Sequence, residues 1–368
     1  MGSSALHEAA KQGDITVVKQ EVDHRFPSPP IDLQDANHCT PLFLACAGGH
    51  IEMVRFLHSR GADINSVNAP EGWTPLWIAT FQNHVKLVHI LCQDLGATVN
   101  CQDRVGRSPL WVGASKGFLS VLQTLHRHGG DVCLTNCEQC TPLLAACSPR
   151  QHPRSNQYLH INDDDNNDDN NDNSQMDVVT FLLEHGVKNK THINTPNIDG
   201  LTPLWVAAYH GNVPLLRLLH SHGADIHHPN TVGESPLWIA CLRNQFRALT
   251  TLYELGGDVD TPSQSGGTPL WMAAQGGNFD MVRALHVLGC DVDKCHTVRT
   301  VTLTYPILLS VSSDGDSTGD SAALLQCTTK LLVMYHTICY DTLCSCHSCW
   351  CCVTVLVLCI ASELIDDC

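Results

Sequence analysis

Positive charge is scarce in this sequence of 368 residues. Lys and Arg together number 21 against 37 Asp and Glu, and the formal net charge is −16. Nucleic-acid binding needs clustered Lys and Arg, and anionic membrane surfaces attract basic segments. The charge balance therefore predicts no nucleic-acid partner, and it disfavours a membrane surface as the partner.

Signals for export and lipid attachment are missing from the N-terminus. The first residues, MGSSALHEAAKQGD, contain no apolar stretch of the kind that a signal peptide requires. Leu6 also stands where the myristoylation pattern needs Ser or Thr. We therefore expect a reducing compartment, the cytoplasm with the nucleus as an alternative. In that setting the cysteines outside the C-terminal tail should be free thiols.

Motifs for catalysis and cofactor binding are missing too. The sequence has no phosphate-binding GxxxxGK[ST] segment, and no combination of Ser, His and Asp stands out as a catalytic set. The Asp- and Asn-rich segment 148–175 lacks both the Gly and the closing Glu of a calcium-binding EF-hand loop. We therefore expect a protein that is not an enzyme, with no catalytic residue, no cofactor and no metal site.

What the chain does contain is a repeated pattern, shown most clearly by residues 198–230. Thr202 is a suitable helix N-cap, and Pro203 fits the first helical position, where its missing N–H costs nothing. Gly211 predicts a helix end in the left-handed backbone conformation. A second helix, with its leucines on one stripe, should run from there to Gly223. Such a pair of short helices cannot bury its apolar surface alone, so it must stack on copies of itself.

Copies of this pattern recur along the chain at a spacing of about 33 residues. Each copy contains a Thr/Ser-Pro-Leu triplet, and one longer gap follows the fourth of these. The triplets begin at Thr40, Thr74, Ser108, Thr141, Thr202, Ser235 and Thr268.

The chain resembles the ankyrin-repeat family. The resemblance is carried by residues 40–65, 74–100, 202–226 and 268–293, which share the triplet, the small apolar residues after it and the Gly-Ala/Cys-Asp turn or a close variant. It implies an all-α solenoid of about eight helix-turn-helix repeats with β-turn fingers. It also implies that the chain binds another protein along the concave face of the array.

The pattern divides the chain into four parts. Residues 1–34 keep both helices but lack the Pro, which is typical of a degenerate capping repeat. Residues 35–296 are the repeats, interrupted at 148–175 by an insertion too polar to order itself. The second helix of the interrupted repeat should resume at residue 176. Residues 297–336 are a candidate C-terminal cap, and 337–368 form a Cys-rich apolar tail.

Several interpretations of the tail remain open. Its cysteines, from Cys344 to Cys352, form one dense run with His347, whereas structural zinc needs two separated pairs of ligands. The apolar stretch 349–361 is shorter than the roughly 20 residues of a membrane-spanning helix. The alternatives are a buried helix, a disordered end, a lipid-modified or inserted anchor, and a misplaced reading frame in the gene model.

The position after Pro-Leu departs from the family. The resemblance implies a His there that joins a hydrogen-bond network, and only His7 keeps it. We expect the replacements to stack between repeats, with apolar burial in place of the polar network. The alternative, an aromatic ladder for stacked bases, is opposed by the acidic charge. The replacements are Phe43, Trp77, Trp111, Leu144, Trp205, Trp238 and Trp271.

Many of the 22 His residues stand near helix ends. A His there is favoured by the helix dipole and can bond the last carbonyl groups, which is the role we expect rather than metal binding. The residues concerned are His58, His126, His128, His185, His220 and His222.

The partner-binding residues follow from the resemblance alone. In ankyrin arrays, the turn before the triplet and the end of the first helix line the concave face. The residues at those positions are Glu71, Trp73, Phe81, Gln82, Arg104, Val105, Arg107, Ser115, Lys116, Ile198, Asp199, Leu201, Tyr209, His210, Thr231, Val232, Glu234, Leu242 and Arg243.

The function we expect is therefore that of a non-catalytic scaffold or adaptor, acting as a monomer on a protein partner. Two alternatives stay open. One is a membrane-tethered adaptor held by the C-terminal tail. The other is a subunit that recruits substrates for a catalytic partner.

Overall fold

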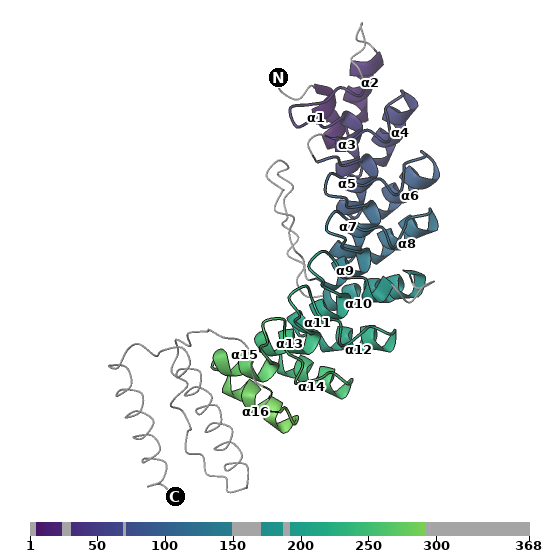
Figure 1. Ribbon diagram of the computed structural model, residues 1–368. Helices are drawn as coiled ribbons and strands as arrows, with labels where there is room; N and C mark the ends of the chain where they lie inside the picture. The colour runs from purple at the N-terminus through teal and green to yellow at the C-terminus, as the bar shows by residue number, and fades with distance from the viewer. Residues whose placement is uncertain are drawn as a thin grey trace, which may run out of the picture.

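The structure is a computed structural model that describes residues 5–23, 31–68, 71–148, 171–186, 192–291 and 294. Across these residues it contains sixteen α-helices, one 3-10 helix and no β-strand. Figure 1 shows the helices stacked in one curved array, with the odd-numbered helices along its concave side and the even-numbered helices along the other. This arrangement confirms the predicted all-α solenoid.

The odd-numbered helices, called inner helices below, alternate with the even-numbered outer helices. The inner helices are α1 (Ala5–Gln12), α3 (Pro41–Ala47), α5 (Pro75–Phe81), α7 (Pro109–Lys116), α9 (Pro142–Cys147), α11 (Pro203–His210), α13 (Pro236–Leu242) and α15 (Pro269–Gln275). The outer helices are α2 (Ile15–Asp23), α4 (Ile51–Ser59), α6 (Val85–Gln93), α8 (Leu119–Arg127), α10 (Asn171–Gly186), α12 (Val213–Ser221), α14 (Phe246–Glu254) and α16 (Phe279–Val287). The 3-10 helix η1 (His192–Asn194) follows α10.

The repeated triplet starts each inner helix from α3 to α15. In α11 the backbone N–H of Trp205 donates to the Thr202 hydroxyl oxygen at 3.3 Å, and Pro203 occupies the first turn, as predicted. Gly211 ends α11 with a φ of 70°, which also confirms the prediction. After α5 and α13 the same left-handed position is held by Asn83 and Asn244, because Asn tolerates this conformation better than most residues.

The core consists of the apolar stripes between neighbouring helix pairs. Each inner helix packs on the next inner helix and on its own outer helix. Leu204 is completely buried, and Leu76, Leu110 and Leu237 at the matching positions are buried as well. Burying a leucine side chain stabilises the fold by roughly 1.5–3 kcal/mol. The array is therefore held together by contacts between neighbours, with no single central core.

Three of the five Trp residues after Pro-Leu bury their rings, whereas Trp111 and Trp271 are half-buried. The expected loss of the polar network is wrong for three of the five. Trp77, Trp205 and Trp238 are nearly fully buried. The indole N–H groups of Trp111, Trp205 and Trp238 donate to backbone oxygens of the next repeat at 3.0, 3.0 and 2.9 Å. The accepting residue stands directly before the next triplet, where the loop returns to the helix. The acceptors are Cys140, Glu234 and Gly267.

The six histidines near helix ends divide into three groups. The Nδ1 atoms of His185 and His222 lie 2.9 Å from the carbonyl oxygens of the residues four positions earlier, which confirms the predicted role. His128 instead contacts the Nδ1 atom of His89 at 3.3 Å. For the rest only the position in the last helical turn is confirmed, and the predicted bond to a carbonyl group is wrong for Nδ1, because these buried atoms have no hydrogen-bond partner among the described residues. They are His58, His126 and His220.

The boundary of the polar insertion differs from the prediction at one end. Helix α10 begins at Asn171 rather than at residue 176, so its first turns lie within the predicted insertion. The predictions for 149–170, for the C-terminal cap at 297–336 and for the tail at 337–368 fall outside the described residues.

Candidate protein-binding surface

The loop before each triplet is called a finger below, and six of the seven fingers are closed by one Asp or Asn side chain that our sequence analysis missed. In the finger 197–201 the Asn197 side-chain oxygen accepts from the backbone N–H of Leu201 at 2.9 Å and from that of Asp199 at 3.0 Å. Asp35, Asn68, Asp103, Asn136 and Asn230 accept equivalent bonds. The signal is visible in the sequence, because an Asp or Asn stands five or six positions before the Thr or Ser in these repeats.

Neighbouring fingers are joined to one another through their backbones. The N–H of Arg104 donates to the carbonyl of Glu71 at 2.9 Å, and that of Thr231 donates to Asp199 at 2.9 Å. The same bond joins Cys137 to Val105, Ile198 to Glu138 and Gln264 to Val232. A run of hydrogen-bonded fingers holds each tip at a fixed position relative to the next.

Three finger tips present apolar side chains to solvent. Val105, Ile198 and Val232 are 49%, 53% and 51% exposed. They lie one per finger, beside the polar or charged residues Arg104, Asp199 and Thr231, all of which are exposed. Aligned apolar groups within a polar rim are the usual composition of a protein-binding surface.

Three of the expected partner-binding residues are instead buried in the array. The Trp73 ring stacks on Trp77 with 4.6 Å between centroids, and Phe81 stacks on the same ring at 5.4 Å. Arg107 Nε donates to the buried Asp103 carboxylate at 2.7 Å, and its guanidinium lies 5.5 Å from the Trp77 ring centre. Trp73 and Arg107 therefore support the inside of their fingers, and Phe81 packs at the end of α5. For Trp73, Phe81 and Arg107 the expectation of an accessible contact is therefore wrong.

The other sixteen expected residues are accessible to different degrees. Nine are exposed: Arg104, Val105, Ile198, Asp199, His210, Thr231, Val232, Leu242 and Arg243. Seven are half-buried: Glu71, Gln82, Ser115, Lys116, Leu201, Tyr209 and Glu234. The structure thus places most of them along the fingers and at the ends of the inner helices, on the concave side of the array.

Basic side chains at the ends of two inner helices lie over aromatic rings of the preceding repeat. Lys116 Nζ is 4.3 Å from the centre of the Phe81 ring, and the Arg243 guanidinium is 4.4 Å from the centre of the Tyr209 ring. The two pairs occupy matching positions in different repeats. Such a cation–π contact is worth about 0.5–1 kcal/mol at exposed sites, so it orients the cation without neutralising its charge.

Comparison with known proteins identifies the array. A family profile described as ankyrin repeats (3 copies) matches residues 6–103 and 169–263, and a profile for a single ankyrin repeat matches 265–297. These matches cover more than half of the chain. It belongs to the ankyrin-repeat family. This confirms the resemblance drawn from the triplets, and the fingers described above are ankyrin fingers.

Two curated relatives share part of this ankyrin array. Protein phosphatase 1 regulatory subunit 27 of Mus musculus and that of Homo sapiens are each 37% identical to the chain over 67 residues. The match covers 18% of this chain and 42% of each relative, so the chain spans less than half the length of the curated relatives it matches.

The charge of the ankyrin surface is unevenly distributed. The inner helices from α3 to α15 contain no Asp or Glu, whereas they carry Lys116 and are followed by Arg243. The fingers carry Glu71, Glu138 and Asp199. The concave side of the ankyrin array is therefore positive along the inner-helix ends and more acidic along the fingers.

Arg243 also affects the residue beside its aromatic partner. The pKa of the His210 imidazole is lowered from its ordinary value, first by partial burial and second by the positive charge of Arg243. His210 is therefore mainly neutral near pH 7 and leaves Arg243 as the principal cation of this part of the surface.

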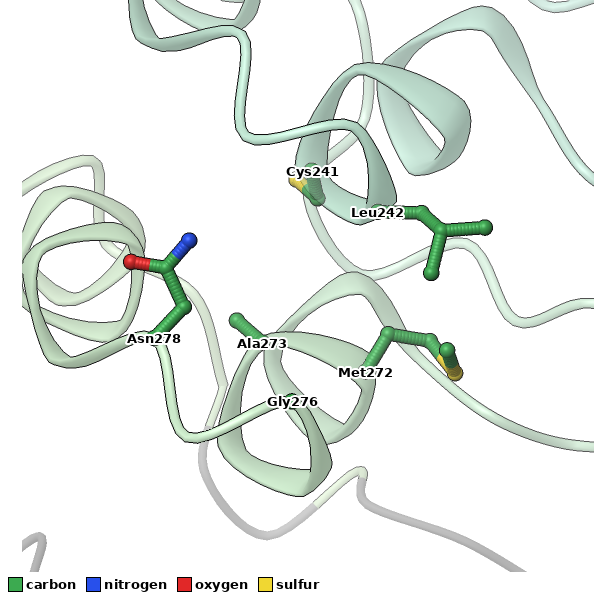
Figure 2. A pocket seen from close by; sticks show the side chains of 6 residues that line it. All are labelled: Cys241, Leu242, Met272, Ala273, Gly276 and Asn278. Atoms are coloured by element: carbon green, nitrogen blue, oxygen red, sulfur yellow. The ribbon is translucent and has the colours of Figure 1, made fainter.

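A pocket of about 260 Å³ opens between α13 and α15 of the array. It is lined by Cys241, Leu242, Met272, Ala273, Gly276 and Asn278. Figure 2 shows Leu242 and Met272 on one side and Asn278 on the other, with Cys241 and Ala273 between the two helices. Our sequence analysis included Leu242 but missed Met272, since no local pattern marks a pocket that forms only when two repeats stack.

Metal-binding and membrane-spanning features are absent from the residues that the structure describes. There, no group of three or more His, Cys, Asp or Glu residues is placed to hold a metal ion. Nor does any helix among those residues combine the length and apolar character needed to cross a membrane. Cys39, Cys46, Cys137 and Cys241 are free thiols, as predicted.

Proposed function

We propose that the ankyrin array is a non-catalytic scaffold or adaptor that binds a partner protein along its fingers and inner-helix ends. The observation that carries the proposal is the row of hydrogen-bonded fingers with Val105, Ile198 and Val232 exposed at their tips. Because the fingers are already ordered, a partner bound there loses little to loop ordering. The array acts in this proposal as a monomer in the cytoplasm or nucleus.

The test is affinity capture of partners from a cell extract with the full chain and with a variant carrying Val105→Ser, Ile198→Ser and Val232→Ser. Exposed substitutions of this kind change stability by about 0.5 kcal/mol or less each. We expect the variant to fold and to lose at least about tenfold of the captured partner, because the contact area of three tips is removed.

A matched control carries Tyr253→Ser and Val287→Ser on the outer helices α14 and α16. These side chains are 42% and 75% exposed and lie away from the fingers. The control should capture the same partners as the unaltered chain. If the finger variant captured as much partner as the unaltered chain, the fingers would be removed from the proposal. If both variants lost the same amount of partner, the capture would reflect non-specific binding to the surface.

A second candidate function is recruitment of substrates to a catalytic partner. The observation that favours it is the match to two proteins named as regulatory subunits of protein phosphatase 1. In this version the array binds a phosphatase or its substrate. Phosphatase activity that co-purifies with the full chain, and is lost with the finger variant, would support it. Partner capture without such activity would leave the scaffold proposal alone.

A further inference from the structure

We infer that the surface formed by Tyr209, His210, Leu242, Arg243 and Met272 binds an acidic, extended segment of a partner protein that inserts an apolar side chain beside Leu242. This surface, called the α11–α15 surface below, lies at the inner-helix ends. The inference rests on the proposed function and specifies the chemistry of the partner.

Charge is the first reason. The inner helices from α3 to α15 carry no carboxylate, although the whole chain has a net charge of −16. Arg243 is exposed and is oriented by its contact with the Tyr209 ring. An oriented guanidinium at the end of an inner helix that carries no carboxylate can form a two-pronged contact with an Asp or Glu of the partner.

The pocket is the second reason. Leu242 precedes Arg243 in the chain, is 45% exposed and forms part of the pocket lining with Met272. Ala273 and the buried Cys241 form the wall behind them, and the Cys241 thiol stays neutral because burial raises its pKa far above its ordinary value. An apolar side chain placed here by a partner gains burial within reach of the cation at Arg243.

The surface does not suit the other macromolecules that bind basic sites. A nucleic acid or an anionic membrane needs several clustered cations, whereas the described inner helices α11, α13 and α15 contain no Lys or Arg and Arg243 follows α13 beside His210, whose pKa is lowered. A single cation beside an apolar pocket matches a short peptide motif in which an acidic residue stands near an apolar one. A second copy of this chain, docking its acidic fingers, is an alternative that the experiment distinguishes.

The experiment uses the full chain and a displayed library of random twelve-residue peptides. We expect the selected peptides to be enriched in Asp or Glu next to Leu, Ile, Met or Phe. The strongest peptide is then synthesised, and its affinity is measured for the unaltered chain and for Arg243→Glu. Hydrogen bonds to charged groups contribute about 1.5–3 kcal/mol, so Arg243→Glu should weaken binding about tenfold or more.

The matched control is Arg217→Glu on the outer helix α12. Arg217 is exposed and forms an ion pair with the exposed Glu254, of a kind that contributes little to stability. The substitution Arg217→Glu makes the same change in net charge as Arg243→Glu. It should leave the affinity for the peptide within about twofold of that of the unaltered chain. Thermal melts of both variants check that they are folded.

A second measurement follows the His210 imidazole by NMR titration. A carboxylate bound beside Arg243 offsets its positive charge, so the pKa of His210 should rise when the peptide is bound. In Arg243→Glu the pKa should already be higher without peptide. A peptide that leaves the pKa of His210 unchanged would overturn the placement of the acidic residue.

The remaining outcomes separate this inference from the proposed function. Selected peptides without acidic enrichment, or acidic peptides insensitive to Arg243→Glu, would overturn the inference. If such peptides still lose affinity with the finger variant, the proposed function stands. A chain that dimerises in solution and becomes monomeric with Arg243→Glu would show a second copy as the occupant and would also overturn the inference. Failure of both variants to alter any selected binding would remove both proposals.

Discussion

The indole hydrogen bonds of Trp111, Trp205 and Trp238 each join one repeat to the next. Trp205 and Trp77 stand at matching positions and are both buried, but only Trp205 has a partner for its indole N–H, the Glu234 carbonyl oxygen at 3.0 Å. The indole nitrogen of Trp77 has no hydrogen-bond partner among the described residues, and its ring stacks between Trp73 and Phe81. The same residue type therefore serves two different functions within one array.

This contrast predicts that the same Trp→Phe substitution lowers the free energy of unfolding by different amounts at the two positions. Trp205→Phe removes a hydrogen bond of the kind worth about 0.5–1.5 kcal/mol as well as part of the ring, whereas Trp77→Phe removes ring area and an unsatisfied donor. We expect Trp205→Phe to destabilise the chain by about 1 kcal/mol more than Trp77→Phe in urea unfolding. A larger loss for Trp77→Phe would show that the indole bond contributes little.

The reactivity of the cysteines is a second property at the residue scale. Burial raises the pKa of the Cys39 thiol to about 12 and that of Cys46 further, so very little reactive thiolate forms at pH 8. Cys137 is exposed on its finger. We expect iodoacetamide to modify Cys137 first and Cys46 last, as read by peptide mass spectrometry. In urea the order should disappear, and a native order with Cys46 first would contradict its burial.

The finger is the element on which the proposed binding surface depends. Gly200 lies at its tip with a φ of 78°, and a Cβ atom added there would lie 2.6 Å from the backbone nitrogen of Thr231. That nitrogen makes the bond to Asp199 that joins two fingers. The left-handed conformation and the close approach both require glycine at this position.

Gly200→Ala should therefore separate two neighbouring fingers. We expect Gly200→Ala to lower the free energy of unfolding more than Gly223→Ala. Gly223 has a positive φ as well, of 93°, but no atom lies near a Cβ added there. The strain common to both is about 1–2 kcal/mol. Hydrogen exchange at the Thr231 amide should accelerate only in Gly200→Ala. Equal exchange in both variants would mean that the finger adjusts without losing the bond.

At the scale of the whole molecule, stability is a sum over neighbours. Helix α11 packs on α9, α12 and α13, so a defect in its core is felt by adjacent pairs and much less by distant ones. The molecule accordingly has no single region whose loss would unfold everything at once. Stability that is spread over neighbouring contacts allows a long binding surface whose residues can be altered one at a time.

Leu204→Ala tests this picture. Leu204 is fully buried in α11, and Leu→Ala changes at such sites cost about 2–5 kcal/mol. We expect a chemical melt to show that loss, with amide protection reduced first in α9, α11, α12 and α13. Wild-type stability would contradict the burial, and uniform loss of protection from α1 to α16 would contradict a nearest-neighbour array.

Much of the fold could be read from local signals in the sequence. The caps at Thr202 and its counterparts, the Pro after each and the left-handed Gly211 are requirements of the backbone within one repeat. Asn83 and Asn244 carry the same signal in a weaker form. The period of about 33 residues then predicts the stack, because each pair needs a neighbour to bury its apolar stripe.

The candidate site was harder to predict. Trp73, Phe81 and Arg107 have side chains typical of binding surfaces, yet the stacked rings and the Asp103 carboxylate hold them inside. A residue that contacts a partner and a residue buried in the array can be of the same type and stand at the same position of the repeat. Only the packing of the adjacent repeat separates the two, as it does for the pocket beside Met272.

The sequence by itself determined that this chain is an ankyrin array, because turns, caps and helix stripes are short-range properties repeated at one period. The tertiary structure decided which indoles bond across repeats, which finger residues face solvent and where α13 and α15 leave a pocket. Those outcomes depend on atoms from two repeats at once, and the distance between such atoms is set only when the repeats stack.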